Sequence, residues 1–406
     1  MVSAAPDLFA IGNGTAPHGA AGAGAASRID RLTRVAEGAD EIAALEPIWR
    51  ELAGAARDHN VFQGFGFALA AARYHEERGE RVLAVVADWD EKPACILPVA
   101  VRRRGGVSVG VFLGDPILQY GDALLLDGAP ARSAELALKR LARDGGIDIF
   151  EFRRVREDAA IGPALRRLAR QSGPAVEAPH ADLTREANVD SFLLRAGGSK
   201  HKRERSRSRR RLEERGEISF EALRGAAAIE PLRHAFALKR DWLARQGDAS
   251  PVIGDPRALA MLERLARDGG DGEGLVVGRL SVGGAAAAYE VGLVRGRRFH
   301  AFLGAVAEDF ASASPGKVAM EQTLAWCRNS GVDVYDMLPP GDAYKRRWSN
   351  GSVPVRNFVA PVSYAGRLYC GVWLDEIRPR LRATLEVMPA ALRRRLGGAA
   401  LKIGGS

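Results

Sequence analysis

The chain contains an internal repeat, which limits how it can fold. When the sequence is shifted by 185 positions without a gap, Pro-Ala-Arg at 130–132 aligns with Pro-Gly-Lys at 315–317. The same shift places residues 143–151 over 328–336, so that a proline, a helix-length segment, a turn and an alternating apolar strand coincide. Self-similarity at one fixed offset indicates a duplicated unit. We therefore expect two copies of one fold.

The length and composition allow two domains. The 406 residues are 47% hydrophobic, which supplies a core for each copy. We predict a disordered leader rich in Ala and Gly at 1–27, an N-terminal domain at 28–180 and a C-terminal domain at 181–365. A basic extension follows at 366–406, and its amphipathic segment 374–401 either packs on the domain surface or binds a membrane surface.

Cysteine and histidine usage indicates the compartment and argues against a metal site. The three cysteines, Cys95, Cys327 and Cys370, are odd in number and far apart, and the seven histidines lack metal-binding spacing. We therefore expect no metal and a reducing, cytoplasmic location. No apolar run is long enough to span a membrane.

The two halves show the same order of predicted elements: two helices, a three-stranded meander, a helix and a further strand. In the first half these are helices at 41–57 and 66–78, strands at 81–88, 94–102 and 107–113, a helix at 130–143, a strand at 147–152 and a helix near 161–171. In the second half, after helical residues 189–194, a basic helix and a strand at 218–222, they are helices at 231–245 and 256–267, strands at 275–282, 285–294 and 298–304, a helix from 315 and a strand at 332–336. A strand at 356–364 would close the sheet. The predicted fold class is α/β (α+β), with a mixed, mainly antiparallel twisted sheet flanked by helices in each copy.

The helix that follows Ser314 has the sequence of an anion site. Ser314 suits the N-cap, Pro315 the first helical position, and Gly316 leaves the backbone N–H groups bare, while Lys317 adds positive charge. The first copy has Ala-Pro-Ala-Arg at 129–132, which lacks the hydroxyl and the small residue. Either this is an ordinary capped helix, or the C-terminal copy has one working anion site.

Positive charge is concentrated in one segment. The net charge is +9, and residues 200–215 contain nine Lys or Arg against three Glu. Such a run suggests nucleic acid, here tRNA rather than DNA, or an anionic membrane surface as a partner. The alternative is a solvated helix edge beside an anionic ligand.

Taken together, these motifs resemble a known family. A meander that leads into an anion-binding helix and a further strand is the order of the GNAT acyltransferase core. Residues 314–317, Tyr335-Asp336, Tyr-Lys-Arg-Arg-Trp at 344–348 and the basic helix ending at 210–213 resemble the CelD-like, BioF2-like acetyltransferases associated with bacterial cellulose and exopolysaccharide synthesis. The resemblance is closest over 190–348. The first half resembles the degenerate partner domain of tandem GNAT proteins and of FemAB-type transferases.

The resemblance implies a donor and an acceptor. Acetyl-CoA or another acyl-CoA would bind with its pyrophosphate at the helix of residues 314–317 and pass its acyl group to an amine or hydroxyl of a small-molecule or carbohydrate acceptor. One departure is the segment 308–313, which has two acids and no glycine where the family has its phosphate loop. An aminoacyl-tRNA donor, or a non-catalytic role in a synthase complex, therefore remains open.

Site roles can be assigned by what acyl transfer needs. In a GNAT-like site the thioester carbonyl would meet backbone N–H groups of the last meander strand, near Phe302, Leu303 and Gly304. Three ionisable residues on strands are candidates for the general base: Glu290, His300 and Asp336.

A further set of residues could serve as the acid or hold the acceptor. Tyr344 and Lys345 could act as the acid or stabilise the oxyanion; alternatively Tyr344 and Trp348 form an apolar stripe and Lys345 is solvated. Five residues are candidates for acceptor binding: Tyr120, Asp122, Lys239, Trp242 and Arg210.

Overall fold

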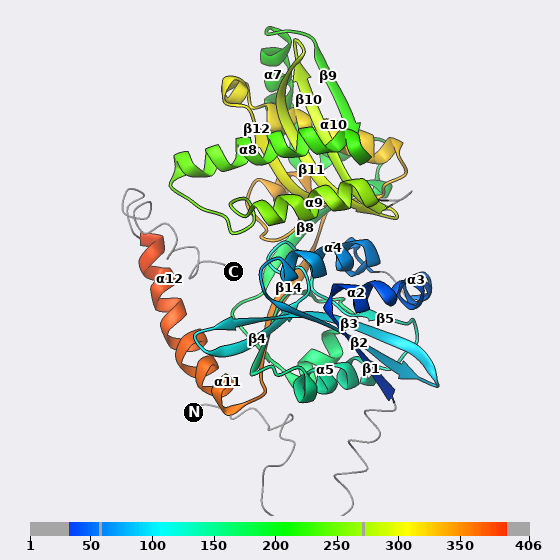
Figure 1. Cartoon of the computed structure of the whole chain (residues 1–406). Helices are drawn as coiled ribbons and strands as arrows, with labels where there is room; N and C mark the ends of the chain where they lie inside the picture. Colours follow the sequence, from blue (N-terminus) through cyan, green and yellow to red (C-terminus); the bar gives the residue numbers. More distant parts are fainter. Residues whose placement is uncertain (1–31, 57–58, 270–272, 388–406) are drawn as a thin grey trace, which may run out of the picture. The chain divides into compact units, whose positions relative to one another are not determined.

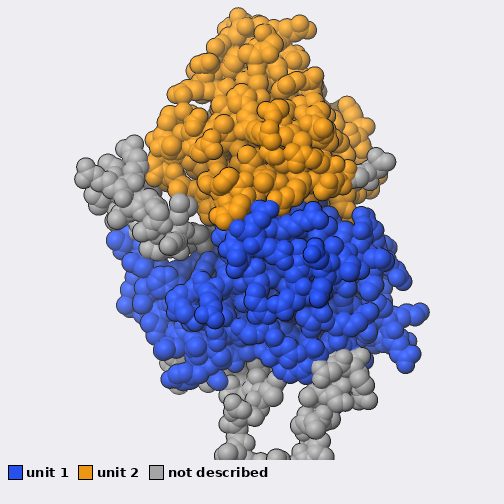
Figure 2. Space-filling view, in the orientation of Figure 1, with its two compact units in different colours: residues 1–175, 355–386 blue, residues 176–354, 387–406 orange. Residues whose placement is uncertain are grey.

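The structure is a computed structural model that describes residues 32–56, 59–269 and 273–387 (Figure 1). The chain forms two compact units (Figure 2). Unit 1 comprises the chain up to Ala175 together with 355–386, and unit 2 comprises 176–354 together with the end of the chain. The predicted leader at 1–27 and most of the predicted extension lie outside the described residues.

Unit 1 contains one sheet with helices on both faces. Its strand order is β1-β2-β3-β4-β6-β14, and β4 and β6 are parallel while the other neighbours in this order are antiparallel. In Figure 1, α5 covers one face of this sheet and α2, α3 and α4 lie over the other. Its elements are β1 (Thr33–Glu37), α2 (Gly38–Ala44), α3 (Glu46–Ala55), η1 (Val61–Gln63), α4 (Phe65–Glu76), β2 (Arg81–Trp89), β3 (Lys92–Arg104), β4 (Val107–Phe112), β5 (Leu124–Leu125), α5 (Arg132–Asp144), β6 (Ile149–Arg156), α6 (Gly162–Leu168), β7 (Arg170–Gln171), most of β14 (Gly351–Pro361), α11 (Tyr364–Leu368), a π-helix (Tyr369–Ile377) and α12 (Arg378–Val387).

Unit 2 repeats this arrangement. Its strand order is β8-β13-β12-β11-β10-β9, with β12 and β13 parallel and the other pairs antiparallel. Its elements are β8 (Val176–Asp182), η2 (Leu183–Arg185), α7 (Val189–Glu213), β9 (Ile218–Leu223), η3 (Gly225–Ala228), α8 (Ile229–Gln246), α9 (Pro256–Asp268), β10 (Glu273–Val282), β11 (Ala285–Arg295), β12 (Arg298–Val306), η4 (Glu308–Ala313), α10 (Pro315–Asn329), β13 (Val334–Asp336) and η5 (Lys345–Trp348).

The predicted duplication is visible in both topology and register. Helices α5 and α10 end at Asp144 and Asn329, and strands β6 and β13 begin at Ile149 and Val334, so each pair is offset by 185 residues. Each unit has an antiparallel meander, a helix and then a strand parallel to the last meander strand. The predicted fold class, two tandem α/β domains with mixed and mainly antiparallel sheets, is confirmed.

Some element boundaries differ from the predictions for local reasons. The helix expected at 41–57 is two helices, because Pro47 follows Glu46 at the start of α3 and requires a fresh helical turn. The helix expected at 161–171 ends at Leu168, since Arg170 and Gln171 pair with β14. The strand expected at 356–364 is β14, whose residues from Val355 to Pro361 pair with β6.

Candidate active site

The two faces of the unit 2 sheet carry different helices. Thr323 of α10 lies 3.2 Å from the position of a Cβ built on Gly278, and Tyr289 is hydrogen bonded at 2.9 Å to His234 of α8. Gly278 is paired with Glu290, the neighbour of Tyr289. Because successive strand residues point to opposite faces, Glu290 faces α10 and Tyr289 faces α8. The same register puts Tyr335 on the α10 face.

Strands β12 and β13 diverge beyond a short parallel contact. They pair over three residues, 298–300 with 334–336. After Asp336 the chain no longer pairs with β12 but stays beside β8, since the N–H of Met337 donates to the carbonyl of Pro179. Strand β12 continues to Val306, and its pairing with β11 skips a residue between Ala301 and Leu303. The expected carbonyl-binding residues, Phe302 to Gly304, therefore lie where the two strands separate.

Gly304 leaves space at this opening. A Cβ built on Gly304 meets no heavy atom of the described residues within 4 Å, and the residue is exposed. It lies directly opposite Glu290 in the β11–β12 register. The opening is therefore lined by backbone on one side and neighbours an ionisable strand residue on the other.

Glu290 and Tyr335 form a buried acid pair. The Tyr335 hydroxyl donates to Oε1 of Glu290 at 2.6 Å, and the two residues are 7% and 0% exposed. Burial raises the pKa of Glu290 to about 7, against the smaller opposing effects of the Tyr335 hydrogen bond and the charge of Lys345. Burial and the adjacent carboxylate hold the pKa of Tyr335 well above its ordinary value. A carboxyl group that titrates near neutrality can accept a proton at physiological pH.

Tyr344 and Lys345 approach the same pair from the loop after β13. Lys345 is 8% exposed, and its Nζ donates to the carbonyl of Leu338 at 2.8 Å. Burial lowers its pKa. Tyr344 is 54% exposed, and burial of its hydroxyl together with the Glu290 charge raises its pKa to about 12. The alternative of an apolar Tyr344–Trp348 stripe with a solvated Lys345 is therefore wrong.

His300 and Asp336 are on the other face of the sheet. Both are 0% exposed, and in the register of β11, β12 and β13 they point away from Glu290. The Nδ1 of His300 lies 3.2 Å from the carbonyl of Leu293. Asp336 accepts from Arg298 at 3.1 Å and from the N–H of Leu338 at 3.0 Å. The structure thus brings Glu290 near Tyr344 and Lys345, and the charge of Asp336 also acts on the pKa of Lys345.

The start of α10 differs from the prediction in one detail. Ser314 is at the N-cap but has φ 55° and ψ 54°, and its hydroxyl makes no capping hydrogen bond to any described residue. The expected serine cap is therefore wrong, because Ser314 also ends η4 and adopts the left-handed conformation there. Pro315 occupies the first turn as predicted. A Cβ on Gly316 would touch only the Val306 side chain, at 3.4 Å, so the first turn of α10 lies against the end of β12.

Helix α7 borders the start of α10 with basic side chains. The Nζ of Lys317 lies 3.3 Å from a carboxylate oxygen of Glu204. Arg211 donates to the carbonyl of Ser312 at 3.4 Å, and Arg215 donates to that of Asp309 at 2.5 Å. The charge of Lys317 is therefore partly balanced, whereas Arg211 of α7 and Arg215 just after it add positive potential beside the start of α10.

The outer side of α7 forms a basic groove of about 590 Å³. The inner side is fixed by Arg205, which pairs with Glu321 of α10 at 3.0 Å, and by His201, whose ring meets Trp348 edge-on at 4.6 Å. These contacts, with Arg209 also pairing with Glu321 at 3.6 Å, fix the rotation of the helix, so that other cations line its outer side. The groove, which we call the α7 groove, is lined by Lys202, Arg203, Ser206, Arg207, Arg210, Arg211 and Glu214.

The residues predicted to hold the acceptor are divided between the two units. Tyr120 is 0% exposed, and its ring lies under the guanidinium of Arg156 at 5.0 Å. Asp122 accepts the backbone N–H groups of Ala160 and Ile161 just before α6, and burial raises its pKa to about 6. Both belong to the interior of unit 1, so burial leaves Tyr120 no surface for an acceptor.

The predicted acceptor residues of unit 2 are at its surface. Trp242 is 43% exposed on α8, with the ammonium of Lys239 over its ring at 4.2 Å, and it is not the core residue that such a tryptophan suggests. Arg210 lines the α7 groove. Sequence reasoning gave Tyr335 no role; its place one residue before Asp336 on an alternating strand was the available signal.

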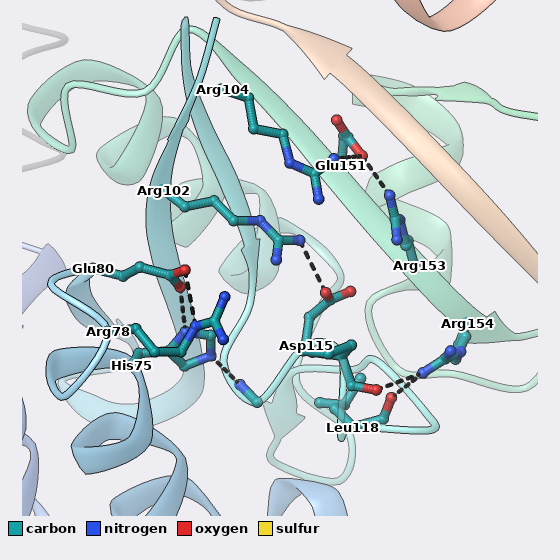
Figure 3. Close-up of polar contacts among 12 residues, drawn as sticks. His75, Arg78, Glu80, Arg102, Arg104, Asp115, Leu118, Glu151, Arg153 and Arg154 are labelled. Atoms are coloured by element: carbon teal, nitrogen blue, oxygen red, sulfur yellow. Dashed lines mark hydrogen bonds and ion pairs between the residues drawn. The ribbon is translucent and has the colours of Figure 1, made fainter. Parts of the chain in front are cut away.

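Unit 1 lacks the acid pair at the corresponding place. In unit 1, Phe150 of β6 lies opposite Gly110 of β4, and this position corresponds to that of Tyr335 opposite Phe299 in unit 2. A phenyl ring has no hydroxyl and cannot donate a hydrogen bond to a carboxylate. The next residue, Glu151, accepts from Arg153 at 2.9 Å within the network of ion pairs drawn in Figure 3. That network also joins His75 with Glu80 at 2.6 Å and Arg102 with Asp115 at 2.9 Å.

Comparison with known families agrees with this geometry. Residues 199–346 match the model of a family described as acetyltransferase (GNAT) domain. The match begins in α7 and ends at Arg346, and so contains the acid pair, the opening and the start of α10. It supports a transferase of the GNAT type. No curated protein matches the sequence.

Solved structures resemble the chain over both units. The crystal structure of FemX shares 12% identity, with a TM-score of 0.58, over 80% of this chain and 98% of that one. The C-terminal domain of a putative lysylphosphatidylglycerol synthetase from Agrobacterium fabrum shares 12% identity, with a TM-score of 0.52, over 83% and 96%. A conserved protein of unknown function from Bacteroides thetaiotaomicron shares 12%, with a TM-score of 0.50, over 79% and 97%. These similarities show a common fold.

The described residues contain neither a group of possible metal ligands nor a helix able to span a membrane. Within 32–56, 59–269 and 273–387, no three His, Cys, Asp or Glu side chains are grouped so as to hold a metal ion. No helix in the same ranges has both the length and the hydropathy needed to cross a membrane.

Proposed function

We propose that unit 2 transfers an acyl group from acyl-CoA, in the simplest case acetyl-CoA, to an amine or hydroxyl of a sugar or of a precursor in cellulose, exopolysaccharide or envelope synthesis. The observation that best supports this proposal is the Glu290–Tyr335 pair beside the opening between β12 and β13. The acceptor class rests on the resemblance to CelD-like proteins, and the cytoplasmic setting rests on the cysteine usage. Unit 1 would then be the degenerate copy.

The chemistry divides among a few groups. Glu290 takes the proton as the acceptor nitrogen or oxygen attacks the thioester carbonyl, since its pKa of about 7 leaves a usable carboxylate at neutral pH. Backbone N–H groups near Phe302 to Gly304 stabilise the oxyanion. The C–S bond breaks, and Tyr344 protonates the leaving thiolate, because its pKa of about 12 keeps the phenol protonated.

The residues at the start of α10 fit a diphosphate. The first-turn N–H groups of a 15-residue helix favour anions, and Pro315 at the first position removes one donor that would otherwise need a partner. Arg211 lies within reach of the same turn through its contact with Ser312. Coenzyme A, when bound, supplies the activated acyl group and its thiol leaving group. The chain supplies the anion site, the base and the opening in the sheet.

A thiol-release assay with acetyl-CoA and a panel of amino sugars and polyamines tests the proposal. We expect Glu290→Gln to lower kcat by about 10²-fold to 10⁴-fold, the usual contribution of a general base. Glu221→Gln is the matched control, since Glu221 pairs with Arg279 at the surface of β9. Equal rates in the two variants would refute the assignment of the base, and no release with any acceptor would favour the non-catalytic alternative.

Binding of the donor can be measured separately. Acetyl-CoA should raise the melting temperature of the wild-type protein in proportion to the logarithm of its concentration. Lys317→Ala should reduce that rise, with Lys139→Ala on α5 as a surface control. An unchanged rise in Lys317→Ala would place the diphosphate elsewhere.

An aminoacyl-tRNA donor is the second candidate, and the α7 groove favours it. FemAB-type transferases, which the sequence resembles, use such donors, and the fold is similar to that of FemX. In that case bulk tRNA should bind, its affinity should fall steeply with salt, and replacing Arg207, Arg210 and Arg211 by Ala should weaken it. Binding that is weak and independent of these residues would exclude it.

A further inference from the structure

The last described segment is one continuous helical stretch packed on unit 1. Helix α11, the π-helix and α12 follow one another without a break from Tyr364 to Val387 (Figure 1). One side is buried, through Gly366, Cys370 and Leu374. A Cβ on Gly366 would lie 1.8 Å from the carbonyl oxygen of Asp148, so this glycine permits the close approach. Of the segment predicted at 374–401, only residues up to 387 are described, and Leu374 is buried there, whereas the rest of that prediction lies outside the described residues.

The opposite side carries large apolar side chains in water. Of the eleven exposed large hydrophobic residues within the described part of the chain, five are in this segment. A folded surface normally scatters such residues singly, so their concentration in eighteen positions is informative. We call them the outer stripe: Tyr364, Leu368, Val372, Ile377 and Leu381, which are 78%, 57%, 47%, 39% and 36% exposed.

The π-helix keeps the outer stripe on one side. The spacing of its members is four, four, five and four residues. The five-residue step from Val372 to Ile377 lies within the π-helix, whose wider turn accommodates the additional residue. Pro379 in the first turn of α12 has no N–H, and its ring would press on the carbonyl four residues earlier, so a wider turn before it relieves the contact.

This spacing argues against a helical protein partner or a second copy of the chain. A coiled-coil seam repeats at three and four residues, so that each side chain enters a gap on the facing helix. The outer stripe has steps of four, four, five and four residues, and therefore does not follow such a repeat. A flat apolar boundary requires only that the side chains point the same way.

The charge of the segment matches an anionic surface. Residues 364–387 contain four Arg against three Asp or Glu, and the sequence at 388–406 adds four Lys or Arg without an acid. Two of the acids are already paired, Asp375 with Arg170 at 2.9 Å and Glu376 with Arg380 at 2.6 Å. Trp373, half-buried, and Tyr364 provide aromatic rings of the kind found at lipid headgroups.

We propose that residues 364–387 bind an anionic lipid surface through the outer stripe. The helix would lie in the plane of the headgroups, with the stripe in the outermost acyl region and the arginines at lipid phosphates. This inference does not depend on acyl transfer, since none of the residues involved is assigned to the candidate active site. It assigns membrane contact to the C-terminal segment rather than to the α7 groove.

Vesicle co-sedimentation of the full chain tests the proposal. We expect binding to vesicles of phosphatidylglycerol and phosphatidylcholine that is at least tenfold stronger than binding to phosphatidylcholine alone, and weaker at high salt. Leu368→Glu should weaken binding at least tenfold, and Leu368→Glu with Val372→Glu should abolish it. Leu194→Glu is the matched control, because Leu194 is 46% exposed on α7 and should bind like wild type. Unchanged melting temperatures would show that the variants fold.

Three outcomes would overturn the inference. The first is that wild-type protein does not bind anionic vesicles. The second is that Leu368→Glu with Val372→Glu binds them like wild type, while replacing Arg207, Arg210 and Arg211 by Glu removes binding, which would assign the contact to the α7 groove. The third is that the stripe variants change the oligomeric mass by light scattering without changing vesicle binding.

Discussion

The buried carboxyl of Glu290 should make unit 2 less stable as the pH rises. Its pKa is raised from 4.5 to about 7 in the folded protein, so between these values the folded state holds a proton that the unfolded state has lost. Stability therefore falls with increasing pH across that window and is level above it. The rise corresponds to about 3 kcal/mol of unfolding free energy at pH 8. Below pH 4.5 the penalty is absent.

Replacement of Glu290 by Gln should remove this penalty. The amide has a similar shape and can still accept the Tyr335 hydroxyl, but it does not ionise. Urea unfolding at pH 4.5 and pH 8 would give the difference in unfolding free energy between the variant and the wild type. Other titrating groups cancel in that difference, and we expect it to shift by about 3 kcal/mol in favour of the variant at pH 8. A difference that is the same at both pH values would refute the reasoning.

Three other residues give direct tests. Tyr335→Phe removes a hydrogen bond that lowers the pKa of Glu290, so the midpoint of the kcat/KM pH profile should move to higher pH. Gly304→Leu should keep the melting temperature, since its Cβ position is open among the described residues, but should lower acyl transfer at least tenfold by filling the opening. Asp122→Ala leaves the N–H groups of Ala160 and Ile161 without their acceptor and should destabilise unit 1 by about 2 kcal/mol in urea unfolding, with kcat unchanged.

The duplication could be predicted because its signals are local. Pro315 begins α10 and Pro130 lies two residues before α5, and the helix lengths and alternating strands that follow are set by short-range patterns. Glu290 could be singled out in the same way, as an acid within an apolar strand. Its partner could not, because Tyr335 is 45 residues away and is brought to it by the parallel pairing of β12 with β13.

Other misses came from tertiary contacts that override the ordinary behaviour of a residue. A lysine beside arginines is usually solvated, but Lys345 is buried, with its Nζ donating a hydrogen bond to the carbonyl of Leu338. A serine before a proline usually caps the helix, but Ser314 must also end η4 and takes a left-handed conformation. Tyr120 is a candidate for acceptor binding by its sequence, whereas its side chain is enclosed in the core of unit 1. In each case the outcome depends on residues outside the local sequence pattern or on the backbone conformation that they impose.

The two copies put the same strand divergence to different uses. In unit 1 the parallel pairing of β4 with β6 is also brief, and the space beyond it is occupied by rings, with Phe112 and Phe152 at 4.4 Å between centroids and Phe150 stacked on Phe152 at 5.1 Å. When β4 is aligned with β12 by their pairing with β6 and β13, Phe112 of unit 1 occupies the position of Ala301 in unit 2. A methyl group in place of a phenyl leaves the gap open there, next to Glu290. Because a buried carboxyl that ionises costs stability, a copy that packs the gap with aromatic rings gains stability from the same topology that the other copy uses to hold a base.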